Sequence, residues 1–343
     1  MSPILTAMRI RAKAIEPKWF LVISFFIAGL FLGGLGLYLW LNIQSPQLQK
    51  IHLSGSSYQY VNPLLAVDIR EGRHFFQNKS LELKLQGFIN AQKENHSITD
   101  TAVYFRDLET GTWTGINEGL NFSPGNLLKL PIMITYLKLA ETDPSILGKS
   151  LKFYGGGLST HNLFQPTDLL KVGSSYTVDE LLRRMIVNSD DNAAALLFDN
   201  VDKASLNEVF SDLGVIYKED AEKPDFIGLK AYTIFFRVLY NATYLNRDFS
   251  EKALELLVDA DNSIGVGAGL PKDIPVANRL GGRTFTVGSK QLFEMHDCGV
   301  IYYPSHPYLL CSAVQGDNLD NLKSFLKELG GIINGEVNYE YKS

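Results

Sequence analysis

Two polar side chains that could take part in chemistry lie one helical turn apart in a strongly apolar segment. The stretch SPGNLLKLPIMITYLKLAE, residues 123–141, carries Asn126 and Lys129 near its start. Ser123 is a suitable N-cap and Pro124 fits the first helical position, so we expect a helix that places Asn126 and Lys129 on one face. A desolvated lysine beside a first-turn side chain has a lowered pKa and can serve as a general base.

This spacing is that of an S-x-x-K nucleophile motif, with asparagine in the position of serine. In such a motif the serine attacks, the lysine helps to remove its proton, and backbone N–H groups hold the oxyanion. Asn126 cannot attack in this way, because its amide nitrogen is delocalised into the carbonyl group. The segment therefore predicts a site that keeps its base and lacks its nucleophile.

A longer segment around this helix resembles the start of a class A β-lactamase-like domain, a family related to the penicillin-binding transpeptidases. That segment is YFRDLETGTWTGINEGLNFSPGNLLKLPIMITYLKLAE. A second segment, YTVDELLRRMIVNSDDNAAALLF, resembles the family's S-D-N element, which follows a helix. Ser189 and Asp190 match this element, and Asp191 stands where the family has asparagine. The change replaces an amide, which donates and accepts hydrogen bonds, by a carboxylate that only accepts and that could pair with Lys129.

A third segment completes the resemblance, which covers roughly residues 60–335 in the family's order. PVANRLGG resembles the K-T-G element on a strand, with Arg279 and Gly281 at its first and last positions. Arginine keeps the positive charge of lysine but not its shape. The family's loop with a deacylating glutamate has no clear counterpart in EDAEKPDF, residues 219–226.

The resemblance implies both a fold and a set of site residues. The fold is α+β, with an antiparallel sheet flanked by helices and an inserted helical subdomain. The family activity is hydrolysis of the β-lactam amide through an acyl-serine, without a cofactor or a metal. Asn126, Lys129, Ser189 and Asp191 then hold the catalytic positions, with the nucleophile substituted, and Arg279 with Gly281 would bind substrate.

The order of the predicted elements fits this architecture. Two strand-like runs, residues 101–108 and 112–117, are joined by a short hairpin connection. A mostly helical stretch follows from about 141 to 258, and strands return at residues 276–280, 296–303 and 308–314. A helix over residues 318–329 closes the pattern. We expect one sheet built from both ends of a domain at 63–335, with a short tail at 336–343.

The N-terminal part predicts a membrane anchor. Residues 19–41 contain no charged side chain, and roughly 20 apolar residues span a bilayer core. Arg9, Arg11, Lys13 and Lys18 precede this span, so the positive-inside bias places residues 1–18 in the cytoplasm and the rest outside it. Residues 42–62 read as a stalk. A cleaved signal peptide is the rival interpretation, but the apolar run is long and the sequence after it is a poor cleavage site.

Glycine and cysteine add two open questions. Gly29 and Gly33 form one GxxxG pair, which is a weak indication of helix dimerisation. Cys298 and Cys311 lie in two strand-like stretches on either side of a turn signal, so they are either a disulfide or two buried thiols. The net charge of −5 argues against nucleic acid as a partner, and the six scattered histidines argue against a zinc hydrolase.

Three functions are compatible with these residues. The first is an anchored, extracytoplasmic pseudoenzyme that binds a peptidoglycan stem peptide or a β-lactam without acylation. The second is a working serine hydrolase that uses Ser189, which would require the oxyanion site to move with the nucleophile. The third is a structural or interaction domain, for which an exposed apolar patch would be expected.

Overall fold

The computed structural model describes residues 58–62, 77–122, 125–156, 169–216 and 227–342, together with Phe25, Gly29 and residues 32–34. The chain divides into two compact units, and residues 58–62 and 77–342 all belong to the second unit. In the first unit, Phe25, Gly29 and residues 32–34 are helical and exposed. Nearly all of the predicted span at 19–41 lies outside the described residues. Within the described part of the chain, every helix falls short of the length and apolar character that a membrane crossing demands.

A five-stranded antiparallel sheet forms the centre of the second unit. Its strand order is β2-β1-β9-β8-β7. The strands are β1 (Asp100–Asp107), β2 (Trp113–Ile116), β7 (Val276–Val287), β8 (Lys290–Ile301) and β9 (Tyr308–Gly316). The first two strands therefore pair with the last strand of the chain, as the sequence predicts for a sheet assembled from both ends of a domain.

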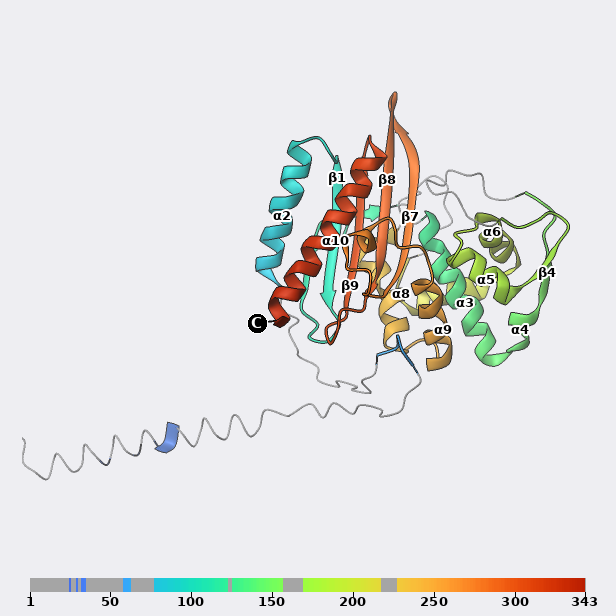
Figure 1. The fold of residues 1–343 in the computed structure, drawn as a ribbon. Coiled ribbons are helices and arrows are strands. Elements are labelled where there is room, and N and C mark those ends of the chain that lie inside the picture. The colour runs from blue at the N-terminus through green and yellow to red at the C-terminus, as the bar shows by residue number, and fades with distance from the viewer. Residues whose placement is uncertain are drawn as a thin grey trace, which may run out of the picture. The chain divides into compact units, whose positions relative to one another are not determined.

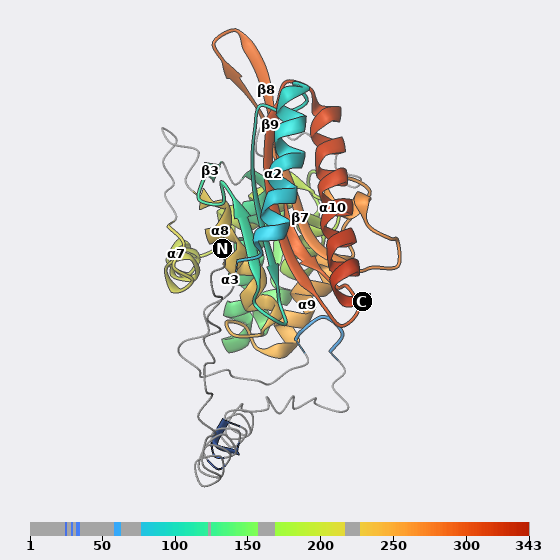
Figure 2. The same cartoon turned by 90° about the vertical axis from the view of Figure 1, so that its left-hand side faces the viewer.

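Helices cover both faces of this sheet, as Figures 1 and 2 show. Helices α2 (Lys79–Glu94) and α10 (Leu319–Lys342) lie side by side on one face, where the rings of Phe88 and Phe325 stack with centroids 5.1 Å apart. Helix α8 (Leu229–Tyr240) packs on the opposite face. Strand β9 is consequently buried on both sides. Leu310 and Val314 belong to the hydrophobic core under α10, whereas Leu309 and Cys311 belong to a second hydrophobic core under α8.

The helices of the inserted subdomain pack around the second hydrophobic core, which lies on the face of the sheet that α8 covers. Its helices are α3 (Lys129–Thr142), α4 (Ser145–Gly148), α5 (Val178–Ile186), α6 (Asp191–Asn200), α7 (Lys203–Asp212), α8 and α9 (Arg247–Val258). Helix α3 is buried around most of its circumference, which explains its nearly continuous apolar sequence. Helix α5 is amphipathic: Leu181, Leu182 and Met185 are buried on one side, and the Thr177 side chain caps its N-terminus. Short strand pairs β3–β6 (Asn121–Phe122 with Ile227–Gly228) and β4–β5 (Ser150–Lys152 with Ser175–Thr177) border this region.

Three elements, strands β7 and β8 and helix α10, are longer than the sequence pattern predicts. Strands β7 and β8 continue as a hairpin up to Val287 and Lys290, and Gly288 takes a φ of 62° in its two-residue connection. Helix α10 does not end at Leu329 but runs to Lys342, because Ile333 and Val337 continue its buried face. Most of the residues expected to form a tail thus belong to the last helix.

Candidate active site

Asn126 and Lys129 occupy the turn that leads into helix α3. Residues Gly125–Leu128 form the 3₁₀ helix η1, and the α-helix begins only at Lys129. The expected helix over residues 123–141 therefore starts as a tighter turn, in which side chains at i and i+3 eclipse each other. Ser123 and Pro124, the expected cap and first helical residue, lie outside the described residues. Lys129 is 3% exposed, so it is not an ordinary surface lysine.

The junction between α5 and α6 brings Ser189, Asp190 and Asp191 to the tip of Lys129. The Lys129 Nζ lies 2.6 Å from Asp191 Oδ1 and donates to the carbonyl oxygen of Ser189 at 2.9 Å. Ser189 has a φ of 57°, a left-handed conformation that turns the chain sharply before α6. The expected pairing of Lys129 with Asp191 is therefore present.

Asp190 has a structural role in this junction. Its Oδ1 accepts from the backbone N–H groups of Asn192 and Ala193, at 2.8 and 3.3 Å, and so caps α6. Its Oδ2 accepts from the N–H of Leu170 at 3.0 Å, which ties the loop before β5 to the same point. The side chain is fully buried.

Arg279 on β7 closes the group from the side of the sheet. Its Nη1 donates to the carbonyl oxygen of Ile186 at 3.0 Å and to Ser189 Oγ at 3.1 Å, and its Nε donates to the carbonyl oxygen of Asn126 at 3.4 Å. Nη2 has no hydrogen-bond partner among the described residues. One guanidinium group thus links η1 to the α5–α6 junction.

Gly281 lies two residues further along β7, beside Asn126. A Cβ atom at position 281 would lie 3.4 Å from Asn126 Cβ and 3.5 Å from His296 Nδ1, which are ordinary contact distances. The rings of His296 and Phe122 pack in a tilted arrangement with centroids 4.7 Å apart, and His296 Nε2 lies 2.7 Å from Glu294 Oε1. Sequence analysis did not place His296 near position 126. That proximity depends on the β7–β8 register, which pairs Gly281 with His296.

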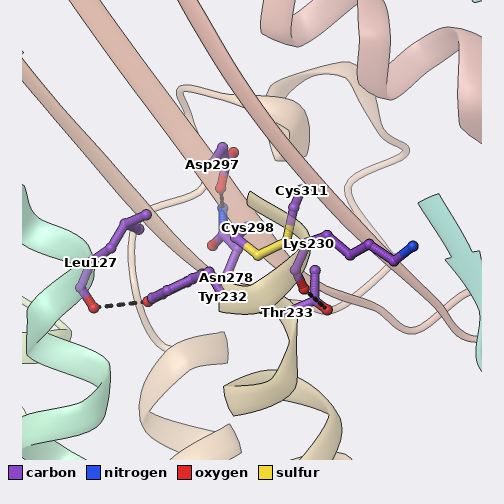
Figure 3. Close-up of a disulfide and its surroundings, with 8 residues drawn as sticks. All are labelled: Leu127, Lys230, Tyr232, Thr233, Asn278, Asp297, Cys298 and Cys311. Carbon is purple, nitrogen blue, oxygen red and sulfur yellow. Dashed lines mark hydrogen bonds between the residues drawn. A yellow bond between two sulfur atoms is a disulfide. The ribbon is translucent and has the colours of Figure 1, made fainter. Parts of the chain in front are cut away.

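A further contact joins η1 to helix α8, which packs on the sheet. The Tyr232 hydroxyl of α8 donates to the carbonyl oxygen of Leu127 at 2.8 Å, and the Cys298–Cys311 disulfide lies beside this ring (Figure 3). Of the two states considered for the cysteines, the structure has the disulfide, which joins directly opposed residues of β8 and β9. Cys298 is also paired with Arg279 across β7 and β8. Sequence analysis missed Tyr232, because nothing in an apolar helix distinguishes one buried tyrosine.

The electrostatics of the site centre on Lys129. Burial, reinforced by the Arg279 charge, lowers the pKa of Lys129 to about 7, against the opposing effects of Asp191 and Asp190. Burial also lowers the pKa of Arg279 to about 10, so the guanidinium stays charged at neutral pH. Within the described residues, no group of three His, Cys, Asp or Glu side chains is placed to hold a metal ion. The arrangement offers a titrating amine, a hydroxyl and a fixed cation, with a carboxamide where a nucleophile would act.

The chain belongs to the beta-lactamase enzyme family, whose model matches residues 81–337. The three motif segments and the sheet with its helical insert all lie within that range. No curated protein sequence matches the chain.

Solved structures of class A β-lactamases and penicillin-binding proteins share this fold. A mutant of PBP-A, solved as an acyl-enzyme complex with penicillin G, is 17% identical over 77% of this chain and 98% of that chain, with a TM-score of 0.62. A β-lactamase from Burkholderia phymatum is 17% identical over 75% and 98% of the two chains, with a TM-score of 0.61. An ancestral class A β-lactamase (GNCA) is 19% identical over 74% and 99%, with a TM-score of 0.59.

Proposed function

We propose that this protein is a membrane-anchored, extracytoplasmic member of its family that binds a β-lactam or a peptidoglycan stem peptide without forming an acyl-enzyme. The observation that carries the proposal is the carboxamide of Asn126 at the nucleophile position, beside Lys129, Ser189 and Arg279. An amide nitrogen is not a useful nucleophile, so the covalent step has no starting atom.

The groups that remain are suited to binding. Arg279 is held in one orientation by three acceptors, and its buried Nη2 has no hydrogen-bond partner among the described residues. A fixed, desolvated guanidinium is an effective partner for a carboxylate, which both proposed ligands carry. The PBP-A mutant with a similar fold was captured with penicillin G, and a shared fold makes a β-lactam a sensible first ligand to test.

The geometry gives less support to Ser189 as a replacement nucleophile. Its hydroxyl oxygen accepts from Arg279, and Lys129 binds the carbonyl oxygen of Ser189 rather than its hydroxyl. A base that faces the wrong oxygen cannot take the hydroxyl proton without a rearrangement. We therefore treat Ser189 as a binding residue.

Intact-mass measurement after exposure to a fluorescent penicillin tests the proposal. The native protein should gain no mass but should bind the ligand reversibly, as seen by calorimetry or fluorescence anisotropy. Asn126→Ser should become acylated, because it restores a hydroxyl beside Lys129, whereas the control Asn126→Ala should not. A mass gain by the native protein would contradict the proposal, and its loss in Ser189→Ala would identify the second serine as the nucleophile.

A further inference from the structure

The amine of Lys129 has two acceptors, and one of them is charged. Asp191 Oδ1 lies 2.6 Å from Nζ, and the carbonyl oxygen of Ser189 lies 2.9 Å away. The side chains of Lys129 and Asp191 are 4% and 17% exposed, so water screens this pair only weakly. Asp191 is also the first residue of α6, where the helix dipole favours a carboxylate.

The charges that face Lys129 come from two directions. Arg279, on β7, disfavours the protonated amine, and burial acts in the same sense. Asp191 and Asp190, on α6, favour the protonated amine. Asp190 is occupied by the cap of α6 and by Leu170, so Asp191 is the carboxylate in direct contact.

We propose that Asp191 is a positioning residue that raises the protonated fraction of the Lys129 amine, so that in this chain only part of the lysine is available as a base for acyl transfer, in addition to the missing nucleophile. The part of this inference that concerns acylation rests on the proposed function. The part that concerns the protonation of Lys129 stands on the ion pair alone.

The consequence for acyl transfer follows from the proton balance. If a serine stands at position 126, its Oγ bonds to the lactam carbonyl carbon while its proton passes to the lone pair of Lys129 Nζ. The lactam C–N bond then breaks, and that proton goes to the departing nitrogen. A protonated lysine has no lone pair with which to begin this sequence. Replacing the nucleophile alone should thus restore acylation, but at a rate that the protonated fraction of Lys129 lowers on the acid side of the pH profile.

The first experiment is a side-chain NMR titration of Lys129 in the native protein and in Asp191→Asn, with Lys129→Met used to assign the signal. Asp191→Asn keeps the size of the side chain and removes its charge. We expect the Lys129 midpoint to fall by at least about one pH unit in Asp191→Asn. Asp199→Asn, which removes an exposed charge from the same helix, should leave the midpoint in place. Equal midpoints in native protein and Asp191→Asn would overturn the proposal.

The second experiment compares acylation of Asn126→Ser with that of the double variant Asn126→Ser/Asp191→Asn. The acid limb of the pH–rate profile should move down by at least about one pH unit in the double variant, making acylation about tenfold faster on that limb. Identical profiles would refute the role of Asp191. So would two variants that bind penicillin and never become acylated.

Should Asp191→Asn fail to fold, Asp191→Ser provides the same test. Failure of the proposed function would appear separately, as acylation or lack of binding in the native protein.

Discussion

The pKa of Lys129 is determined by the surroundings of the side chain more than by the residue type. Its pKa of about 7 lies well below the ordinary 10.5, chiefly because burial penalises the charged amine. The unfolded chain therefore binds more protons than the folded chain between pH 7 and 10.5. By linkage, the free energy of unfolding rises with pH across that window, and the penalty for burying the charged lysine is greatest below pH 7.

A variant without the amine tests this linkage. The unfolding free energy of the native protein should rise relative to that of Lys129→Met by up to about 1.4 kcal/mol per pH unit above pH 7. Urea denaturation at several pH values up to about 9 would measure the difference. Lys149→Met, which changes an exposed lysine, is the matched control and should show no such slope. A parallel pH dependence in native protein and Lys129→Met would contradict the lowered pKa.

At the scale of elements, a short segment before the domain is bound to helix α9 by one carboxylate. Glu251 is 6% exposed, and its two oxygens accept from the backbone N–H groups of Gln59, Tyr60 and Val61. The Tyr60 ring packs on Tyr302 with centroids 5.2 Å apart. Residues 58–62, which the sequence pattern assigns to the end of a stalk, therefore make specific contacts with the folded unit.

Glu251→Gln tests this attachment. The amide keeps the size of the side chain but turns one acceptor into a donor, so at least one N–H of residues 59–61 loses its partner. We expect a loss of about 1–3 kcal/mol in local or global stability. Hydrogen exchange at residues 59–61 should accelerate, and thermal unfolding would show whether the effect spreads. Glu255→Gln, on the exposed side of α9, should leave the exchange unchanged; equal protection in both variants would mean that Glu251 does not hold the segment.

At the scale of the whole molecule, the proposed anchor makes a prediction about location. The full chain should sediment with membranes and resist extraction at alkaline pH, because residues 19–41 supply an apolar span of bilayer length. A chain that begins at residue 50 should remain in the supernatant with its fold intact. A product that has been cleaved after residue 41 would favour the signal-peptide interpretation, and an uncleaved product that stays in the supernatant would contradict both interpretations. Intact mass of the purified protein separates these outcomes.

Much of the fold follows from local pattern, and for that reason could be predicted. The hairpins β1–β2 and β8–β9, the apolar α3 and the amphipathic α5 depend on residues close together in the chain. Element ends were less predictable. The Ile333–Val337 continuation of α10 and the outer part of the β7–β8 hairpin show weak patterns on their own, and packing or pairing with distant partners extends them.

The sequence by itself determined that a carboxamide, not a hydroxyl, stands at position 126, since that is a matter of residue identity. It also determined which segments would be apolar enough to form the two cores. Only the tertiary structure decided the contacts and the pKa of Lys129. Its contact with Asp191, the charge of Arg279 on β7 and the burial of Lys129 and Arg279 depend on groups far apart in the chain. The same holds for the Cys298–Cys311 bond, because proximity across strands is set by register and not by spacing.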